Sequence, residues 1–216
     1  MEDFTGIRKR VYDAAMNLYH SGLIRLSAGN VSARVNEELI AITPSGRPYT
    51  ILQPEDNPII SLDRKLVDGA YRPSSESPLH TTIYREMPEV GGIVHTHSIY
   101  AITFAASNKP LPVLCVEGLA AFSDGPIPVA RYVSPGSPHA GEVAMEVFRA
   151  KPGLKALLLK NHGLLAIGQN VEAAWETAYN IETAAQIAYQ AYAIGNPIEL
   201  TMEQIEEVYK IYGMRR

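Results

Sequence analysis

Apolar residues recur at helical spacing in several segments of the chain. Positions 7, 11, 14, 15 and 18 are apolar, which predicts a first helix that ends near Gly22. Ser77-Pro78 and Ser137-Pro138 each open a further helix, since proline suits the first helical turn, and Pro88 ends the former. Apolar positions 171, 174, 175, 178, 181 and 185 mark a long helix, and a last one is expected over about 202–212.

Short runs rich in Val, Ile and Leu separate these helices and predict β-strands. Residues 26–43 are expected to form two strands joined by a turn at Asn36-Glu37, and 59–67 a second hairpin. Residues 91–97 predict a strand followed by a helix, and two strands at 154–159 and 164–167 flank a tight turn. Because strands and helices alternate irregularly, the pattern favours one α/β domain over 1–216 with a largely antiparallel or mixed sheet.

Composition narrows the classes of function. The 216 residues are 46% hydrophobic and 19% charged, which is typical of a globular domain. The net charge of −4 gives no general attraction to nucleic acid or anionic lipid. The N-terminal residues lack the apolar core of a secretory signal, and no apolar run approaches the ~20 residues that span a bilayer. We therefore expect a cytoplasmic protein with neither nucleic acid nor membrane as partner.

Histidines are the residue type that suggests chemistry. His95 and His97 lie two apart in a predicted strand, so both imidazoles project from the same face. They form either a pair of metal ligands or a pair of ordinary strand residues. His162 lies in the predicted turn between two apolar strands and could supply a third nitrogen, or could simply bond a backbone carbonyl. Three neutral imidazoles with an open position are typical of a catalytic divalent-metal site.

Several polar turns could bind an anion. Glu76 stands at the entrance of a predicted helix, where a carboxylate is favoured as a cap and where free N–H groups and serine hydroxyls can bind an anion. His80 follows by four residues on the same helical face; it could be a ligand, but a supporting or packing role is favoured. The turns 27–30 and 43–46 can present N–H groups to phosphate, or can be ordinary turns.

Taken in order, these motifs resemble the class II aldolase/adducin family, and within it the L-fuculose-1-phosphate aldolases. The resemblance extends over nearly the whole chain. It is carried by Ser27-Ala28-Gly29-Asn30-Val31-Ser32, Ile42-Thr43-Pro44-Ser45-Gly46, Pro73-Ser74-Ser75-Glu76, His95-Thr96-His97, Asn161-His162-Gly163 and Tyr209-Lys210-Ile211-Tyr212-Gly213.

The resemblance implies a site and an assembly. It implies a Zn²⁺ ion, or Mn²⁺ or Co²⁺ as in some members, held by His95, His97 and His162 with Glu76 as an exchangeable fourth ligand. It implies a phosphate pocket formed by Asn30, Ser45, Gly46, Ser74 and Ser75. The family fold is a central antiparallel sheet flanked by helices, usually assembled as a homotetramer with its active sites between subunits.

The implied activity is reversible aldol cleavage of a ketose 1-phosphate, such as L-fuculose 1-phosphate, to glycerone phosphate and an aldehyde. Glu76 would leave the metal as substrate enters and carry the proton at the reacting carbon. Tyr212 matches a tyrosine that helps to close the site. Val116 stands where the fuculose-phosphate enzymes carry a proton-donating tyrosine. Either Glu117, Tyr212 or water replaces that donor, or the substrate differs.

The same motifs are compatible with other activities of this family. A phospho-sugar acid decarboxylase or a methylthioribulose-phosphate dehydratase would use a similar metal and phosphate pocket. A ribulose-phosphate 4-epimerase is disfavoured because those enzymes generally carry aspartate where Glu76 stands. A non-catalytic, adducin-like interaction module is disfavoured because all the ligand positions of the metal site are filled.

Overall fold

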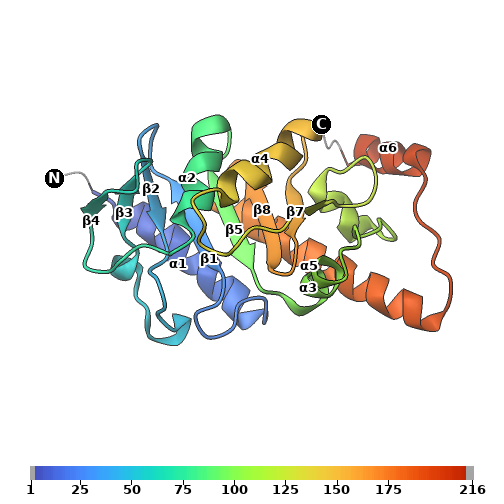
Figure 1. Cartoon of the computed structure of the whole chain (residues 1–216), viewed down its shortest axis with the longest axis horizontal. Helices are drawn as coiled ribbons and strands as arrows, with labels where there is room; N and C mark the ends of the chain where they lie inside the picture. The colour runs from blue at the N-terminus through green and yellow to red at the C-terminus, as the bar shows by residue number, and fades with distance from the viewer. Residues whose placement is uncertain (1–2, 213–216) are drawn as a thin grey trace.

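A mixed β-sheet lies at the centre of the computed structural model, which describes residues 3–212 (Figure 1). Within these residues, eight strands follow one another in the order β4-β3-β2-β1-β5-β8-β7-β6, and neighbours are antiparallel except for β6 and β7. Gly213 of the C-terminal motif and the outer limits of the predicted domain lie outside the described residues. The strands are β1 (Asn30–Arg34), β2 (Leu39–Ile42), β3 (Ile59–Ser61), β4 (Leu66–Asp68), β5 (Gly92–Thr96), β6 (Val129–Ala130), β7 (Ala156–Leu159) and β8 (Gly163–Gly168).

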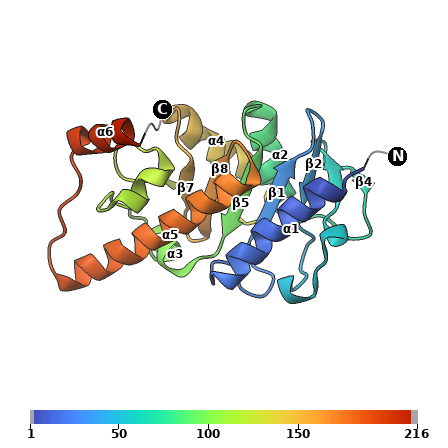
Figure 2. The ribbon, with the colours of Figure 1, turned by 180° about the vertical axis from the view of Figure 1, so that it is seen from behind.

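Helices cover both faces of this sheet, as the two opposite views show (Figures 1 and 2). One face carries α2 (Ser77–Glu86) and α4 (Ala140–Ala150), and the other carries α1 (Thr5–His20), α3 (Ile99–Ala106) and α5 (Val171–Ile194). Side chains alternate along each strand, so in β5 Ile93 packs with α2 and α4 while Val94 packs on the opposite face. The predicted α/β fold with a mainly antiparallel sheet flanked by helices is confirmed.

Local sequence accounts for the end of the first long helix and the start of the second. α1 buries Val11 and Leu18 as its periodicity predicts, and Gly22 follows its end with φ +76°, a conformation that glycine adopts without steric cost. α5 begins after Asn170, whose side-chain oxygen accepts a hydrogen bond of 2.8 Å from the Ala173 N–H. Both ends are therefore specified by residues next to the helices.

The segment between α3 and α4 is less regular than its apolar content suggests. It holds a 3₁₀ helix, η3 (Val116–Ala121), and the two-residue strand β6, neither of which the periodicity predicts. The C-terminal helix α6 (Met202–Ile211) packs on η3, burying Ile205 and Tyr209 against Leu119. Two shorter 3₁₀ turns, η1 (Tyr49–Ile51) and η2 (Pro54–Asp56), connect β2 to β3. Among the described helices, none combines the length and the apolar character that crossing a bilayer demands.

Candidate metal and substrate site

Three imidazoles and one carboxylate from distant parts of the chain meet at the end of β5. His95 lies in β5, and His97 follows one residue after the strand ends. His162 lies in the turn between β7 and β8, and Glu76 immediately precedes α2. Each side chain offers one ligand atom, and these four atoms all lie within 4.8 Å of one another. The structure thus brings together all four residues that the resemblance assigns to a metal.

The sheet register explains this convergence. His95 pairs with Leu165 of β8, so the β7–β8 turn that carries His162 reaches the end of β5. Asn161 in that turn has φ +57°, a left-handed conformation that asparagine tolerates. Gly163 then passes so close to β5 that a Cβ atom would lie 2.2 Å from the Thr96 carbonyl oxygen. A side chain at position 163 would therefore push the turn away from His95.

The spacing of the ligand atoms suits tetrahedral coordination. The Nε2 atoms of His95 and His97 are 3.0 Å apart. The carboxylate of Glu76 lies 3.1 Å from His95 Nε2 through Oε2, and 3.4 Å from His162 Nε2 through Oε1. Ligands about 2.0–2.1 Å from a tetrahedral zinc ion are themselves about 3.3 Å apart. These three separations are therefore close to those between the ligands of such a site.

Hydrogen bonding also leaves the right atoms free for a cation. His95 Nδ1 lies 2.9 Å from the carbonyl oxygen of Leu164, to which it donates, so the lone pair is on Nε2 and faces the cluster. Among residues 3–212, Glu76 Oε1 finds no hydrogen-bond partner although it is buried. A buried carboxylate oxygen is costly without a partner, and a cation would satisfy it. Three imidazole nitrogens and one carboxylate fit zinc and similar divalent ions.

Electrostatics keep the imidazoles in the form that binds metal. Burial lowers the pKa of His95 to about 3 and also lowers the pKa values of His97 and His162, although the Glu76 carboxylate opposes this. Burial would raise the pKa of Glu76, but the neighbouring imidazoles and its hydrogen bond from Asn30 outweigh that effect and lower it. At neutral pH the site therefore presents neutral nitrogens and a carboxylate anion.

A cavity of about 230 Å³ opens onto this cluster. It is lined by Glu76, His97 and His162, while His95 is buried beneath. The other lining residues come from polar turns and include every residue that the resemblance assigns to phosphate: Ser27, Ala28, Gly29, Asn30, Pro44, Ser45, Gly46, Ser74, Ser75, Pro135 and Gly136. The structure places the two predicted sets of residues around one space.

Existing hydrogen bonds restrict what these polar residues can offer a ligand. Ser45 N–H is bonded to the Arg72 carbonyl, so Ser45 has its hydroxyl available. Ser74 Oγ accepts from the Glu76 N–H at 3.2 Å and keeps its own proton to donate. Asn30 donates to Glu76 Oε2 at 2.8 Å, and only the second hydrogen of its amide nitrogen is free for a ligand. Glu76 itself makes no side-chain cap to α2, because its carboxylate points to the cluster.

The structure differs from the expected site in two respects. Pro135 and Gly136 line the cavity without having been predicted, although the turn-forming run Ser134-Pro135-Gly136-Ser137 is the signal that could have drawn attention to them. Tyr212, Val116 and Glu117 line a separate cavity of about 300 Å³. That cavity shares no lining residue, among those described, with the cavity at the cluster.

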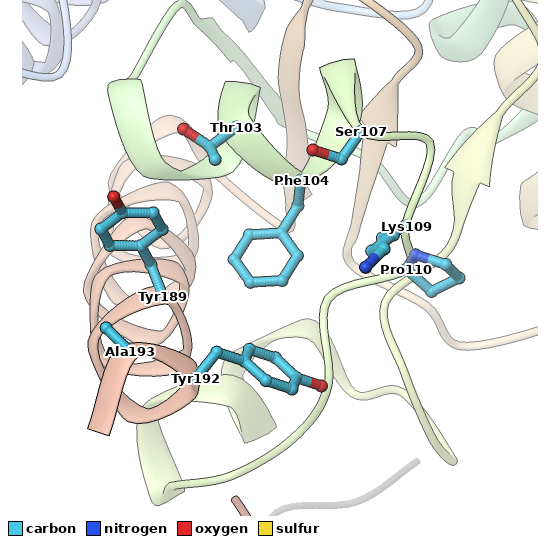
Figure 3. A pocket seen from close by; sticks show the side chains of 8 residues that line it. All are labelled: Thr103, Phe104, Ser107, Lys109, Pro110, Tyr189, Tyr192 and Ala193. Carbon is cyan, nitrogen blue, oxygen red and sulfur yellow. The ribbon is translucent and has the colours of Figure 1, made fainter. Parts of the chain in front are cut away.

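A larger cavity, of about 450 Å³, lies between α3 and the C-terminal part of α5 (Figure 3). Phe104, Tyr189 and Tyr192 form most of its apolar wall, and Lys109 is the charged side chain among its described lining residues. It contains none of the acid, base or ligand groups described above. Cavity size therefore does not indicate where the chemistry lies in this fold.

Comparison with known proteins identifies the family to which the chain belongs. Residues 9–189 match the family model described as Class II Aldolase and Adducin N-terminal domain, and the chain belongs to that family. It is similar to the 5-deoxy-D-ribulose 1-phosphate aldolase of Bacillus thuringiensis serovar kurstaki, 36% identical over 94% of this chain and 93% of the relative. It is also similar to the L-ribulose-5-phosphate 4-epimerase of Salmonella paratyphi C, 33% identical over 89% and 90%.

Solved structures show the same fold. An L-fuculose 1-phosphate aldolase superimposes with a TM-score of 0.87 at 28% identity, covering 96% of each chain. The L-fuculose-1-phosphate aldolase of Thermus thermophilus gives 0.70 at 26% identity, covering 89% of this chain and 98% of that one. The protein is therefore an enzyme of the metal-dependent class II aldolase type.

Proposed function

We propose that this enzyme catalyses the reversible aldol cleavage of a ketose 1-phosphate to glycerone phosphate and a short aldehyde. The observation that supports the proposal is the shared cavity, in which the Glu76–histidine cluster faces two turns rich in hydroxyl groups. The curated relative that acts on 5-deoxy-D-ribulose 1-phosphate makes that sugar the first substrate to test. L-Fuculose 1-phosphate is the second, given the solved neighbours.

Each group in the cavity has a proposed task. When bound by the three histidines, zinc or a similar ion supplies Lewis-acid charge for the substrate carbonyl oxygen. Ser45, Gly46, Ser74, Ser75 and Asn30 hold the phosphate and so orient the sugar. As the bond between C3 and C4 breaks, the C4 hydroxyl loses its proton to form the aldehyde. Glu76, once substrate has displaced it from the metal into a drier pocket that raises its pKa, takes a proton from solvent and delivers it to C3.

The acceptor of the C4 hydroxyl proton is proposed to come from a neighbouring subunit. The side chain of Val116 can neither accept nor donate a proton, and Tyr212 lines a cavity separate from the one at the cluster of its own chain. In a homotetramer, Tyr212 or Glu117 of the next subunit would complete the site, with water as the remaining alternative. Light scattering gives the oligomer size, and Tyr212→Phe and Glu117→Gln identify the residue by a fall in kcat.

The test is release of glycerone phosphate, measured by coupled NADH oxidation, from 5-deoxy-D-ribulose 1-phosphate and L-fuculose 1-phosphate. We expect release by the zinc-loaded enzyme, none by the chelated enzyme, and at least ~10²-fold lower kcat for Glu76→Gln, since general acid–base catalysis contributes 10²–10⁴-fold. Release from neither sugar would overturn the proposal.

Epimerisation of a pentulose 5-phosphate is the second candidate, because relatives named as 4-epimerases are similar to this chain. Incubation with L-ribulose 5-phosphate, followed by chromatography of the pentulose products, tests it in parallel. Decarboxylation and dehydration would be tested in parallel incubations with other sugar phosphates and followed by carbon dioxide release and by product mass.

A further inference from the structure

A buried histidine one helical turn after Glu76 has no part in the scheme above. His80, on α2, is completely buried, and each of its ring nitrogens has a hydrogen-bond partner. Nε2 lies 2.5 Å from Asn30 Oδ1, and Nδ1 lies 2.6 Å from Ser32 Oγ. Ser32 Oγ is in turn 2.9 Å from the hydroxyl of Tyr84. With the bond from Asn30 to Glu76, these groups form a continuous chain of hydrogen bonds.

Glu76, at the end of this series of hydrogen bonds, fixes the direction in which each bond donates. The carboxylate of Glu76 can only accept, so the Asn30 amide must turn its N–H groups toward Glu76 and its oxygen toward His80. His80 therefore carries its proton on Nε2 and donates it to Asn30. Nδ1 must then accept from the Ser32 hydroxyl, which leaves Ser32 Oγ to accept from Tyr84. Every bond in the chain donates toward Glu76.

This direction matters because an asparagine amide is nearly symmetric in shape. Rotated by half a turn, Asn30 would fit the same space but would present its oxygen to the Glu76 carboxylate. The Nε2–H group of His80 excludes that orientation, because it requires an oxygen opposite it. With Oε2 fixed by Asn30, the other oxygen, Oε1, is the one that lies 3.4 Å from His162 Nε2.

We propose that His80 is a positioning residue: by donating from Nε2 to Asn30 it holds the amide that orients Glu76, and so directs Oε1 to the metal and to the reacting carbon. The effect on catalysis rests on the proposed function, whereas the effect on metal binding does not. The competing interpretation is that His80 only fills space in the core formed with Ile83 and Ile93.

Two substitutions separate these interpretations. His80→Gln places an amide N–H where Nε2 stood and keeps the bond to Asn30. His80→Asn ends near the position of Nδ1, so it can still meet Ser32 but does not reach Asn30. Both variants remove the ring and leave a polar side chain in the same core, which makes each the control for the other. Zinc affinity by chelator competition and the absorption spectrum of the Co²⁺ form are measured together with kcat and KM.

We expect His80→Gln to bind zinc within about threefold of the parent, and His80→Asn to bind it ~10–100-fold more weakly, the range typical of groups that orient metal ligands. Of the two variants, only His80→Asn should show a changed Co²⁺ spectrum. The kcat of His80→Asn should fall while its KM for the ketose phosphate stays constant. Equal zinc affinity in both variants, whether retained or lost, would overturn the proposal, since the bond to Asn30 would then not be the deciding factor.

A measurement on the unsubstituted protein covers the case in which His80→Asn does not fold. Nitrogen-15 NMR of the histidine-labelled, zinc-loaded protein should show His80 as the neutral tautomer protonated on Nε2. A proton on Nδ1 would contradict the proposal. If the parent released no glycerone phosphate, the proposed function would fail, while the zinc, cobalt and NMR readouts would still decide the role of His80.

Discussion

Replacing Gly163 by alanine tests whether the close approach of β8 to β5 builds the metal site. The added carbon would lie 2.2 Å from the Thr96 carbonyl oxygen and 2.9 Å from Cε1 of His95, where ordinary contacts begin at 3.4 Å. The first overlap is with backbone in a central strand and cannot be relieved by turning a side chain. Overpacking of a buried site costs ~1–3 kcal/mol, and we expect the upper end of that range, about 3 kcal/mol.

Urea unfolding of the metal-free protein measures this cost, and Gly6→Ala is its matched control. Gly6 lies in α1 with open space around its Cβ position, so alanine there should stabilise by up to about 1 kcal/mol through helix propensity. The same chemical change should thus have opposite signs at the two positions. Zinc affinity should fall in Gly163→Ala, since the turn that carries His162 moves with β8, and should not change in Gly6→Ala.

The reasoning fails if Gly163→Ala unfolds within about 0.5 kcal/mol of the parent and binds zinc equally well. The strands would then be able to separate at no cost, and the position of His162 would not depend on the contact between β5 and β8. A loss of stability with unchanged zinc affinity would refute only the expected loss of zinc affinity, because it would show that the turn that carries His162 keeps its place when the strands move.

Three further results are expected. His97→Ala should remove stoichiometric zinc binding, measured by metal analysis after dialysis, and leave the far-ultraviolet circular dichroism unchanged; full activity would show that His97 is not a ligand. Burial lowers the pKa of His80 to about 4, so the unfolded chain takes up its proton first as the pH falls below about 6.5. Between pH 7 and 4.5 the metal-free protein should therefore lose about 2 kcal/mol more unfolding free energy than His80→Gln does, and equal losses in urea titrations would contradict this. Asn170→Ala should cost about 1 kcal/mol through loss of the cap to the Ala173 N–H, and unchanged thermal unfolding would exclude a contribution from that cap.

The elements that could be predicted are those whose signals are local. The apolar face of α5 and the proline at the start of α2 lie within the helices they define, so periodicity and capping locate them. The shared orientation of His95 and His97 follows from strand alternation, and the structure places their Nε2 atoms 3.0 Å apart. β6 and η3 escaped prediction because they span two and six residues and owe their shape to packing against β7 and α6.

The convergence of the site residues depends on contacts between distant segments of the chain. That His162 meets His95 follows from the pairing of β5 with β8, which spans about seventy positions of chain and which no local pattern determines. The resemblance supplied that link by matching motifs in order. It could not supply the contact of Gly136 with Ser75, whose carbonyl oxygen lies 3.4 Å from the position of a Cβ on Gly136, because the turn-forming run around Gly136 is not among the motifs that carry the resemblance.

Asn30 belongs both to the cavity lining and to the buried hydrogen bonds that hold Glu76. The resemblance gives it to the phosphate pocket, and it does line the cavity, but its oxygen and one of its hydrogens are held by His80 and Glu76. Because it pairs with His95 across β1 and β5, its side chain lies on the same sheet face as the cluster and points toward α2. The position of the carboxylate therefore depends on how α2 packs on the sheet, and on side chains such as His80 that do not line the cavity.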